Sequence, residues 1–214
     1  MQIISHRGYW KINSEKNKIK AFERSFNLGF GIETDIRDFN GELVISHDIP
    51  ISSLEELIYV DDFFKLYKLI GNNLTLALNI KSDGLQEKLE NLINKYNISN
   101  YFVFDMSTPD TLKYMNMGIN FFSRQSEFEV TPSLYNQCSG ILLDEFVNHW
   151  ITPDILENHL KKNKLVCIVS PELHGRSNLK EWEQYKNFIT NQFSDNLILC
   201  TDKPEEAKKY FYED

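Results

Sequence analysis

Two carboxylates, Glu33 and Asp35, lie two residues apart inside a run of apolar residues. On a β-strand this spacing directs both side chains to the same face of the sheet. Two carboxylates that point the same way repel each other unless one takes up a proton or a cation joins them. Mg²⁺ and Ca²⁺ prefer oxygen ligands, so the pair predicts a divalent-cation site.

Basic and imidazole side chains follow other apolar runs of the chain. His6 and Arg7 follow the first run, His47 follows a later one, and Asn79 and Lys81 end a third with the same spacing of two. Arginine and lysine bind phosphate oxygens, and imidazole exchanges protons near neutral pH. A single histidine after a strand is often only a surface or core residue. Two histidines, an arginine, a lysine and two acids after three early strands indicate a functional site.

Short runs of Val, Ile, Phe and Leu alternate with amphipathic stretches along the chain, which is typical of βα units around a parallel sheet. The expected strands are 2–5, 31–37 (with 43–46 following closely), 74–80, 101–105, 120–123, 140–143, 165–170 and 197–201. The expected helices are 19–28, 54–69, 85–96, 110–115, 153–161, 179–190 and 204–212.

These units predict an α/β fold, a small (β/α)₈ TIM barrel in which residues 1–214 form a single domain. In such a barrel the active site is formed by residues at the C-terminal ends of the strands, which is where the polar residues above occur. A doubly wound open sheet is the competing fold. The turn at residues 6–10 carries neither of the glycine-rich phosphate-loop patterns that many such sheets have.

The composition excludes one class of binding partner and indicates a cellular compartment. The chain has 31 acidic and 23 basic residues and a net charge of −8, which argues against nucleic-acid binding through a broad basic face. It has no long uncharged apolar run and no basic amphipathic anchor, so we expect a soluble cytoplasmic protein without stable membrane anchoring. Cys138, Cys167 and Cys200 lack metal or redox spacing and are expected to be reduced core thiols. No pattern indicates an oligomeric state.

Taken together, the motifs resemble the glycerophosphodiester phosphodiesterase family, which belongs with the phosphatidylinositol-specific phospholipase C-like barrels. The resemblance extends over the whole chain and is strongest in its first half. The segments that carry it are HRG at 6–8, ExD at 33–35, GxLVxSHD at 41–48, NIK at 79–81 and TDKPEEA at 201–207.

The resemblance implies a metal-dependent hydrolase that splits a small glycerol-containing phosphodiester into glycerol phosphate and an alcohol. The implied residues are Glu33 and Asp35 for a divalent cation (Mg²⁺ or Ca²⁺), His6 and His47 for acid–base catalysis, and Arg7 and Lys81 for the phosphate oxygens. A cation and two basic side chains stabilise the charge of a phosphodiester, while two imidazoles move the protons. The nucleophile is either water or a neighbouring hydroxyl of the substrate.

The chain departs from the family pattern in two ways. Asn79 stands where the third metal ligand is usually acidic, so an amide oxygen has to serve and the site carries less negative charge. Asp83, Asp105 or Asp144 is a candidate to compensate. The segment from Asp48 to Leu74 is also short for the family, which predicts a compact member with an open mouth.

Specificity is then expected to depend on residues that follow the later strands. The four residues expected to line the substrate pocket are Arg124, Glu127, Glu172 and His174. Their mixed charges suit a small polar head group better than a lipid tail.

Three alternatives stay open. The same chemistry could act on a nucleotide-linked or polymer-derived glycerol phosphate, or on a lysophospholipid. A non-catalytic barrel could bind a phosphorylated ligand; the two histidines argue against this, and Asn79 argues mildly for it. A lyase could use Lys81 to form an imine, but Arg7 nearby favours an anion site over a carbonyl pocket.

Overall fold

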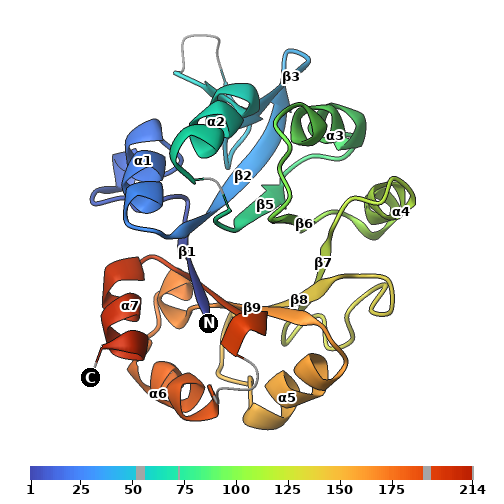
Figure 1. Ribbon diagram of the computed structural model, residues 1–214. Helices are drawn as coiled ribbons and strands as arrows, with labels where there is room; N and C mark the ends of the chain where they lie inside the picture. The colour runs from blue at the N-terminus through green and yellow to red at the C-terminus, as the bar shows by residue number, and fades with distance from the viewer. Residues whose placement is uncertain (52–55, 72, 190–193, 214) are drawn as a thin grey trace. The chain divides into compact units, whose positions relative to one another are not determined.

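The structure is a computed structural model that describes residues 1–51, 56–71, 73–189 and 194–213. The chain divides into two compact units (Figure 1). One unit comprises Met1–Ile4 and Phe122–Asp214, and the other comprises Ser5–Phe121. We call them the C-terminal unit and the N-terminal unit. A single domain over residues 1–214 stays a prediction.

The N-terminal unit contains the early strands and runs from blue to green in Figure 1. Its strands are the end of β1 (Gln2–His6), then β2 (Gly31–Phe39), β3 (Glu42–Ile45), β4 (Ile58–Tyr59), β5 (Leu76–Ile80) and β6 (Tyr101–Phe104). β2 is parallel to β5 and β5 to β6, whereas β3 is antiparallel to both β2 and β4. Its helices are α1 (Ile19–Asn27), α2 (Val60–Leu66), α3 (Gln86–Lys95) and α4 (Thr108–Asn116).

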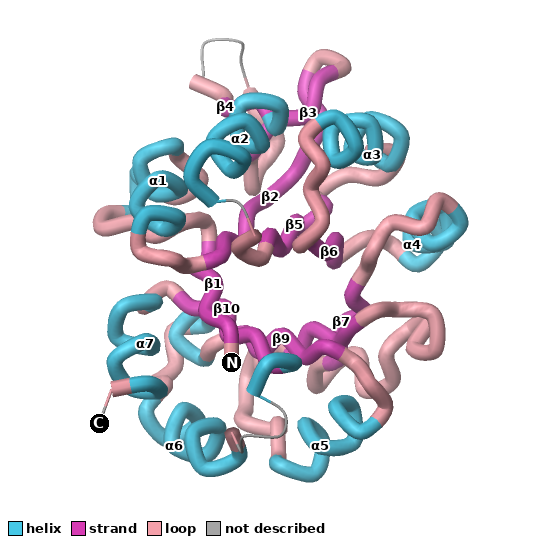
Figure 2. Tube along the Cα trace, viewed as in Figure 1, coloured by secondary structure: helices cyan, strands magenta, loops and turns pink. Residues whose placement is uncertain are grey.

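The C-terminal unit contains four consecutive parallel strands beside the start of β1. They are β7 (Phe122–Gln125), β8 (Gly140–Leu143), β9 (Leu165–Val169) and β10 (Leu197–Thr201). Its helices are α5 (Pro153–Lys161), α6 (Leu179–Phe188) and α7 (Pro204–Tyr212), which lie along one face of these strands (Figure 2). A burial pattern without an exposed residue in β5, β8 and β10 explains why these strands read as continuous apolar runs.

Local chemistry explains several helix starts. The Ser107 hydroxyl accepts a hydrogen bond from the backbone N–H of Asp110, and the Thr152 hydroxyl accepts one from Ile155. In both cases a proline stands in the first turn, where its missing N–H costs no helical hydrogen bond. The second helix begins at residue 153 as predicted, whereas the first begins at Thr108, two residues before the predicted start.

The structure corrects the expected helix 54–69. Ile58 and Tyr59 pair with β3 as strand β4, so the helix begins only at Val60; residues 54 and 55 lie outside the described part of the chain. The β-branched and aromatic residues at 58–59 find a strand partner, which outweighs their helical periodicity. Residue 190, the expected end of another helix, also lies outside the described residues.

The expected strand at 43–46 is the second strand of a hairpin. β2 continues to Phe39, and the turn at Asn40 and Gly41 has φ angles of 49° and 83°. Two left-handed residues in a row form the tight turn that joins antiparallel strands, and an Asn-Gly pair adopts it at low cost.

Two further expectations concern the core and membranes. Cys138, Cys167 and Cys200 are buried free thiols, as predicted. Among the helices of the described residues, none is long and apolar enough to cross a membrane.

Candidate active site

The turn after β1 brings Arg7 beside Glu33 and Asp35 of β2. Arg7 and Gly8 both have left-handed backbones, with φ angles of 56° and 77°. The Arg7 backbone N–H is bonded to the carbonyl oxygen of Glu33 at 2.9 Å and lies 3.1 Å from its carboxylate Oε2. A Cβ at position 8 would lie 2.9 Å from Cβ of Ala21, so this turn requires glycine. The glycine of the HRG segment is therefore required by the backbone of this turn.

Glu33 and Asp35 lie on β2 as a pair of buried carboxylates. Their side chains are only 5% and 1% exposed. Burial, together with the negative charge of Asp35, raises the pKa of Glu33 to about 7, and the nearby cations offset this only in part. His6 Nε2 lies 4.0 Å from Glu33 Oε2. The pair therefore carries the electrostatic strain that the sequence predicted.

The carboxylate of Asp35 is contacted by the side chains of Arg7, Asn17 and Lys81. Arg7 Nε lies 3.2 Å from Oδ2, and the amide of Asn17 donates to the same oxygen at 2.7 Å. Lys81 Nζ lies 3.3 Å from the other oxygen, Oδ1. Among the described residues, Oδ1 has no hydrogen-bond partner although it is buried. The two predicted phosphate-binding cations thus lie beside the predicted metal ligands.

Asn79 lies directly beside Asp35, because the parallel register of β2 and β5 pairs these two residues. Asn79 is 8% exposed, and its Oδ1 is buried with no hydrogen-bond partner in the described part of the chain. Buried polar oxygens are normally paired, since leaving them unpaired costs free energy. A hard divalent cation would satisfy both Oδ1 atoms, so the donor set of Glu33, Asp35 and Asn79 fits such an ion.

His47 follows β3 and is 44% exposed. Its Nδ1 lies 2.9 Å from the Asp48 carboxylate, and Arg37 donates to its backbone carbonyl at 3.3 Å. His47 and Arg7 line the same cavity of about 560 Å³. The second predicted catalytic histidine therefore shares a cavity with the predicted phosphate-binding arginine.

The predicted pocket residues from the later strands belong to the C-terminal unit. Glu127 accepts the backbone N–H groups of Phe146, Val147 and Asn148 at 2.8–3.1 Å. Burial opposes ionisation of Glu127, but these donors prevail and lower its pKa to about 2. Glu127 therefore organises the loop after β8, a role that the sequence did not indicate.

The other three pocket candidates also have partners. Glu172 accepts hydrogen bonds from the hydroxyls of Ser170 and Thr201, which connects the ends of β9 and β10. His174 Nε2 lies 2.6 Å from Oδ1 of Asp144. Arg124 lies 5.4 Å from the ring centre of Phe146 and 3.7 Å from the Glu129 carboxylate. Their contact with a substrate stays a prediction.

The compensation predicted for Asn79 by Asp83, Asp105 or Asp144 stays a prediction. Asp83 accepts a hydrogen bond from the Ser107 hydroxyl and is exposed, and Asp144 is paired with His174. Asp105 follows β6, the strand that pairs with β5, on which Asn79 lies.

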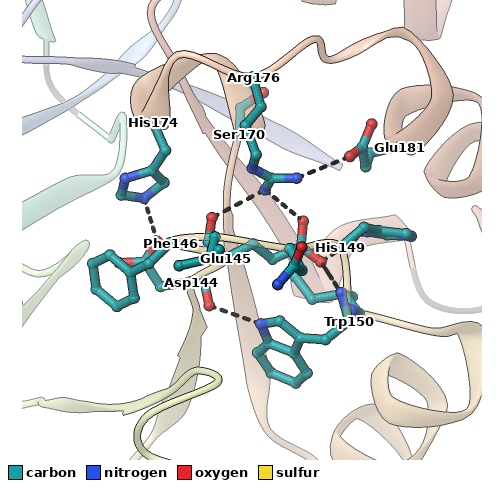
Figure 3. Close-up of polar contacts among 12 residues, drawn as sticks. Asp144, Glu145, Phe146, His149, Trp150, Ser170, His174, Arg176 and Glu181 are labelled. Atoms are coloured by element: carbon teal, nitrogen blue, oxygen red, sulfur yellow. Dashed lines mark hydrogen bonds and ion pairs between the residues drawn. The ribbon is translucent and has the colours of Figure 1, made fainter.

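Another buried acid, Glu145, lies just after β8 and has many partners (Figure 3). Its Oε1 accepts from His149 Nδ1 and from the backbone N–H groups of residues 150 and 151, each at 2.8 Å. The Arg176 guanidinium bridges Glu145 and Glu181 at 3.0 and 3.1 Å. Sequence reasoning missed this network, because its members come from three separate segments.

The ligand atoms of Glu145, His149 and Glu181 lie within 4.8 Å of one another, which is close enough for a metal ion. Arg176, however, already neutralises both carboxylates. A metal would have to displace this guanidinium and the donors on Oε1. We therefore interpret the network as a structural ion cluster.

Comparison with known proteins supports the fold through solved structures. A protein of Galdieria sulphuraria assigned to the glycerophosphodiester phosphodiesterases matches with a TM-score of 0.76 at 17% identity, over 98% of this chain and 97% of that one. A glycerophosphodiester phosphodiesterase from Agrobacterium tumefaciens matches at 0.70 and 15%, over 99% and 98%. A phosphodiesterase from Oleispira antarctica, in complex with its product sn-glycerol-3-phosphate, matches at 0.64 and 15%, over 98% and 96%.

No family model matches the chain, and no curated protein matches it in sequence. At these identities the structural likeness shows the fold: the chain has the α/β fold of the phosphodiesterase barrels, which confirms the predicted fold class. The similarity covers nearly the full length of both chains, in agreement with a compact member of this fold.

Proposed function

We propose that this chain is a phosphoric diester hydrolase of the glycerophosphodiester phosphodiesterase family. Its substrate is a small glycerol-containing phosphodiester, which it converts to glycerol phosphate and an alcohol. The observation that carries the proposal is the pair of buried Oδ1 atoms of Asp35 and Asn79, which have no hydrogen-bond partner among the described residues and lie beside Arg7 and Lys81. The solved phosphodiesterases of the same fold, one of them with bound glycerol-3-phosphate, support the choice of substrate.

A divalent cation, Mg²⁺ or Ca²⁺, is held in this proposal by Glu33, Asp35 and Asn79. When bound, it stabilises negative charge on the phosphate oxygens. The buried carboxylate pair also accounts for the need for a cation, because the two charges otherwise favour protonation of Glu33.

The remaining residues bind the phosphate and move protons. Arg7 and Lys81 are the cations at the site, and both lie within 3.3 Å of Asp35, from which they turn toward the anionic substrate. His6 beside Glu33 and His47 in the cavity of Arg7 form the acid–base pair: one removes a proton from the nucleophile and the other protonates the leaving oxygen.

The test is hydrolysis of a small panel of glycerophosphodiesters, measured by a coupled assay for glycerol-3-phosphate. The chain is stripped of metal, and then Mg²⁺ or Ca²⁺ is added back. We expect activity that returns with the cation and falls by about 10² to 10⁴-fold in both His6→Ala and His47→Ala.

Activity that persists in both histidine variants would contradict the proposal. Cation binding without turnover on any diester would favour a barrel that only binds a phosphorylated ligand. The neutral side chain of Asn79 argues mildly for this alternative. Nucleotide-linked glycerol phosphates and lysophospholipids belong in the panel as the alternative diesters.

A further inference from the structure

One donor to the Asp35 carboxylate, the amide of Asn17, belongs to none of the motifs above. Asn17 lies in the loop between the turn at Asn13–Glu15 and α1, and it is only 9% exposed. Its Nδ2 donates to Asp35 Oδ2 at 2.7 Å, a shorter contact than that of Arg7 or Lys81. A buried amide directed at a candidate metal ligand calls for a functional explanation.

The orientation of this amide is fixed from the other side. Thr34 is fully buried, and its hydroxyl donates to Asn17 Oδ1 at 2.8 Å. Since Oδ1 is the accepting end, the NH₂ end has to face Asp35. The backbone N–H of Asn17 in turn donates to the carbonyl oxygen of Arg7 at 2.9 Å. Asn17 therefore joins the loop that carries Arg7 to the strand that carries Asp35.

The contacts on Asp35 divide its two oxygens. Asn17 and Arg7 both engage Oδ2, so Oδ1 is left on the side of Lys81 with no hydrogen-bond partner among the residues described. Asn79, whose Oδ1 also has no hydrogen-bond partner in the described part of the chain, is the register partner of Asp35. The rotation of the Asp35 carboxylate thus decides which oxygen is available beside Asn79.

We propose that Asn17 is a positioning residue: its amide locks the Asp35 carboxylate so that Oδ1 is presented, together with Asn79 Oδ1, to a divalent cation. The inference rests on the proposed function, since it concerns the same cation site. An outer residue that orients a metal ligand typically changes metal affinity by about 10 to 100-fold when it is removed.

The backbone of Asn17 allows a clean test. Its φ is 56°, a left-handed conformation that glycine adopts without strain. Asn17→Gly therefore removes the amide, and the backbone can keep the same conformation. Asn97→Gly is the matched control, because Asn97 has a φ of 47°, lies in the same unit and is exposed in the turn after α3.

The measurement is the Kd for Mg²⁺ and for Ca²⁺, by calorimetry on the metal-stripped full chain, with the thermal midpoint of each metal-free variant recorded beside it. We expect Asn17→Gly to raise the Kd by at least about tenfold and Asn97→Gly to leave it unchanged. A merely structural role would lower the midpoint of Asn17→Gly without raising its Kd.

A double-mutant cycle tests whether the hydrogen bond from Thr34 to Asn17 orients the amide. Thr34→Val removes the hydroxyl that fixes the amide and should raise the Kd several-fold, and the double variant should bind no more weakly than Asn17→Gly alone. Should Asn17→Gly fail to fold, Thr34→Val alone decides the question. A wild-type Kd in the folded variants would overturn the role of Asn17 and leave the cation site standing; absence of cation binding in the wild-type chain would overturn both.

Discussion

Buried acids in the two units show how differently the same chemistry can be used. Glu145 in the C-terminal unit is fully buried, and donors and the Arg176 guanidinium occupy both of its oxygens. Asp35 in the N-terminal unit is equally buried; Lys81 Nζ lies 3.3 Å from its Oδ1, yet this oxygen has no hydrogen-bond partner among the described residues. A complete set of partners makes a buried acid a structural element, whereas an incomplete set marks a place for an added cation.

The largest expected difference concerns Glu33. Glu33→Gln keeps the shape of the side chain but removes a charged ligand, so cation-dependent hydrolysis should fall by about 10³-fold or more. The coupled glycerol-3-phosphate assay measures this. Glu181→Gln is the control, because it alters an acid of the ion cluster, which in our interpretation holds no cation. Retention of more than a tenth of the activity in Glu33→Gln would argue against a metal at β2.

Glu145→Gln should lower stability and leave cation binding unchanged. The substitution leaves Arg176 without its buried carboxylate and places an NH₂ group against N–H donors, which should lower the free energy of unfolding by about 3 kcal/mol. Denaturant unfolding of the full chain measures the loss. The Kd for Mg²⁺ should not change in the variant that remains folded. A weaker Kd with unchanged stability would show that the ion cluster is a metal site after all.

A smaller effect concerns pH and the metal-free chain. The pKa of Glu33 is raised in the folded state, so the native chain holds a proton that the unfolded chain has lost between about pH 4.5 and 7. Stability from this source is present at low pH and is lost as the pH rises, by about 2 kcal/mol between pH 5 and 8. Unfolding at both pH values should show this decline in the wild-type chain and a weaker one in Glu33→Gln. The same decline in both proteins would assign it to another group.

Part of the site could be predicted from the sequence. The spacing of Glu33 and Asp35 on an apolar strand predicted a buried pair on one face, because the side-chain period of a strand is two. The position of Asn79 at the end of another strand was also predictable. Its place directly beside Asp35 depends on the register between β2 and β5, which the residues of one strand do not determine.

Other parts of the site depend on loops. Asn17 reaches Asp35 through a left-handed turn that no periodic pattern indicates. The partners of Glu145 are 4 to 6 residues away and again about 31 residues away, so only the folded loops bring them together. The expected helix over 54–69 was too long at its start, because strand pairing of Ile58 and Tyr59 is a tertiary contact.

The most direct test of the cation site at Glu33, Asp35 and Asn79 is a calorimetric titration of the metal-stripped chain with Mg²⁺ and Ca²⁺ at pH 6 and pH 8. Because the pKa of Glu33 is about 7, a cation has to displace a proton at pH 6, so binding should be weaker there and should release protons. We expect binding at pH 8 that Glu33→Gln abolishes and Glu181→Gln leaves intact. Binding that survives Glu33→Gln but disappears in Glu181→Gln would contradict the account and place the metal in the ion cluster.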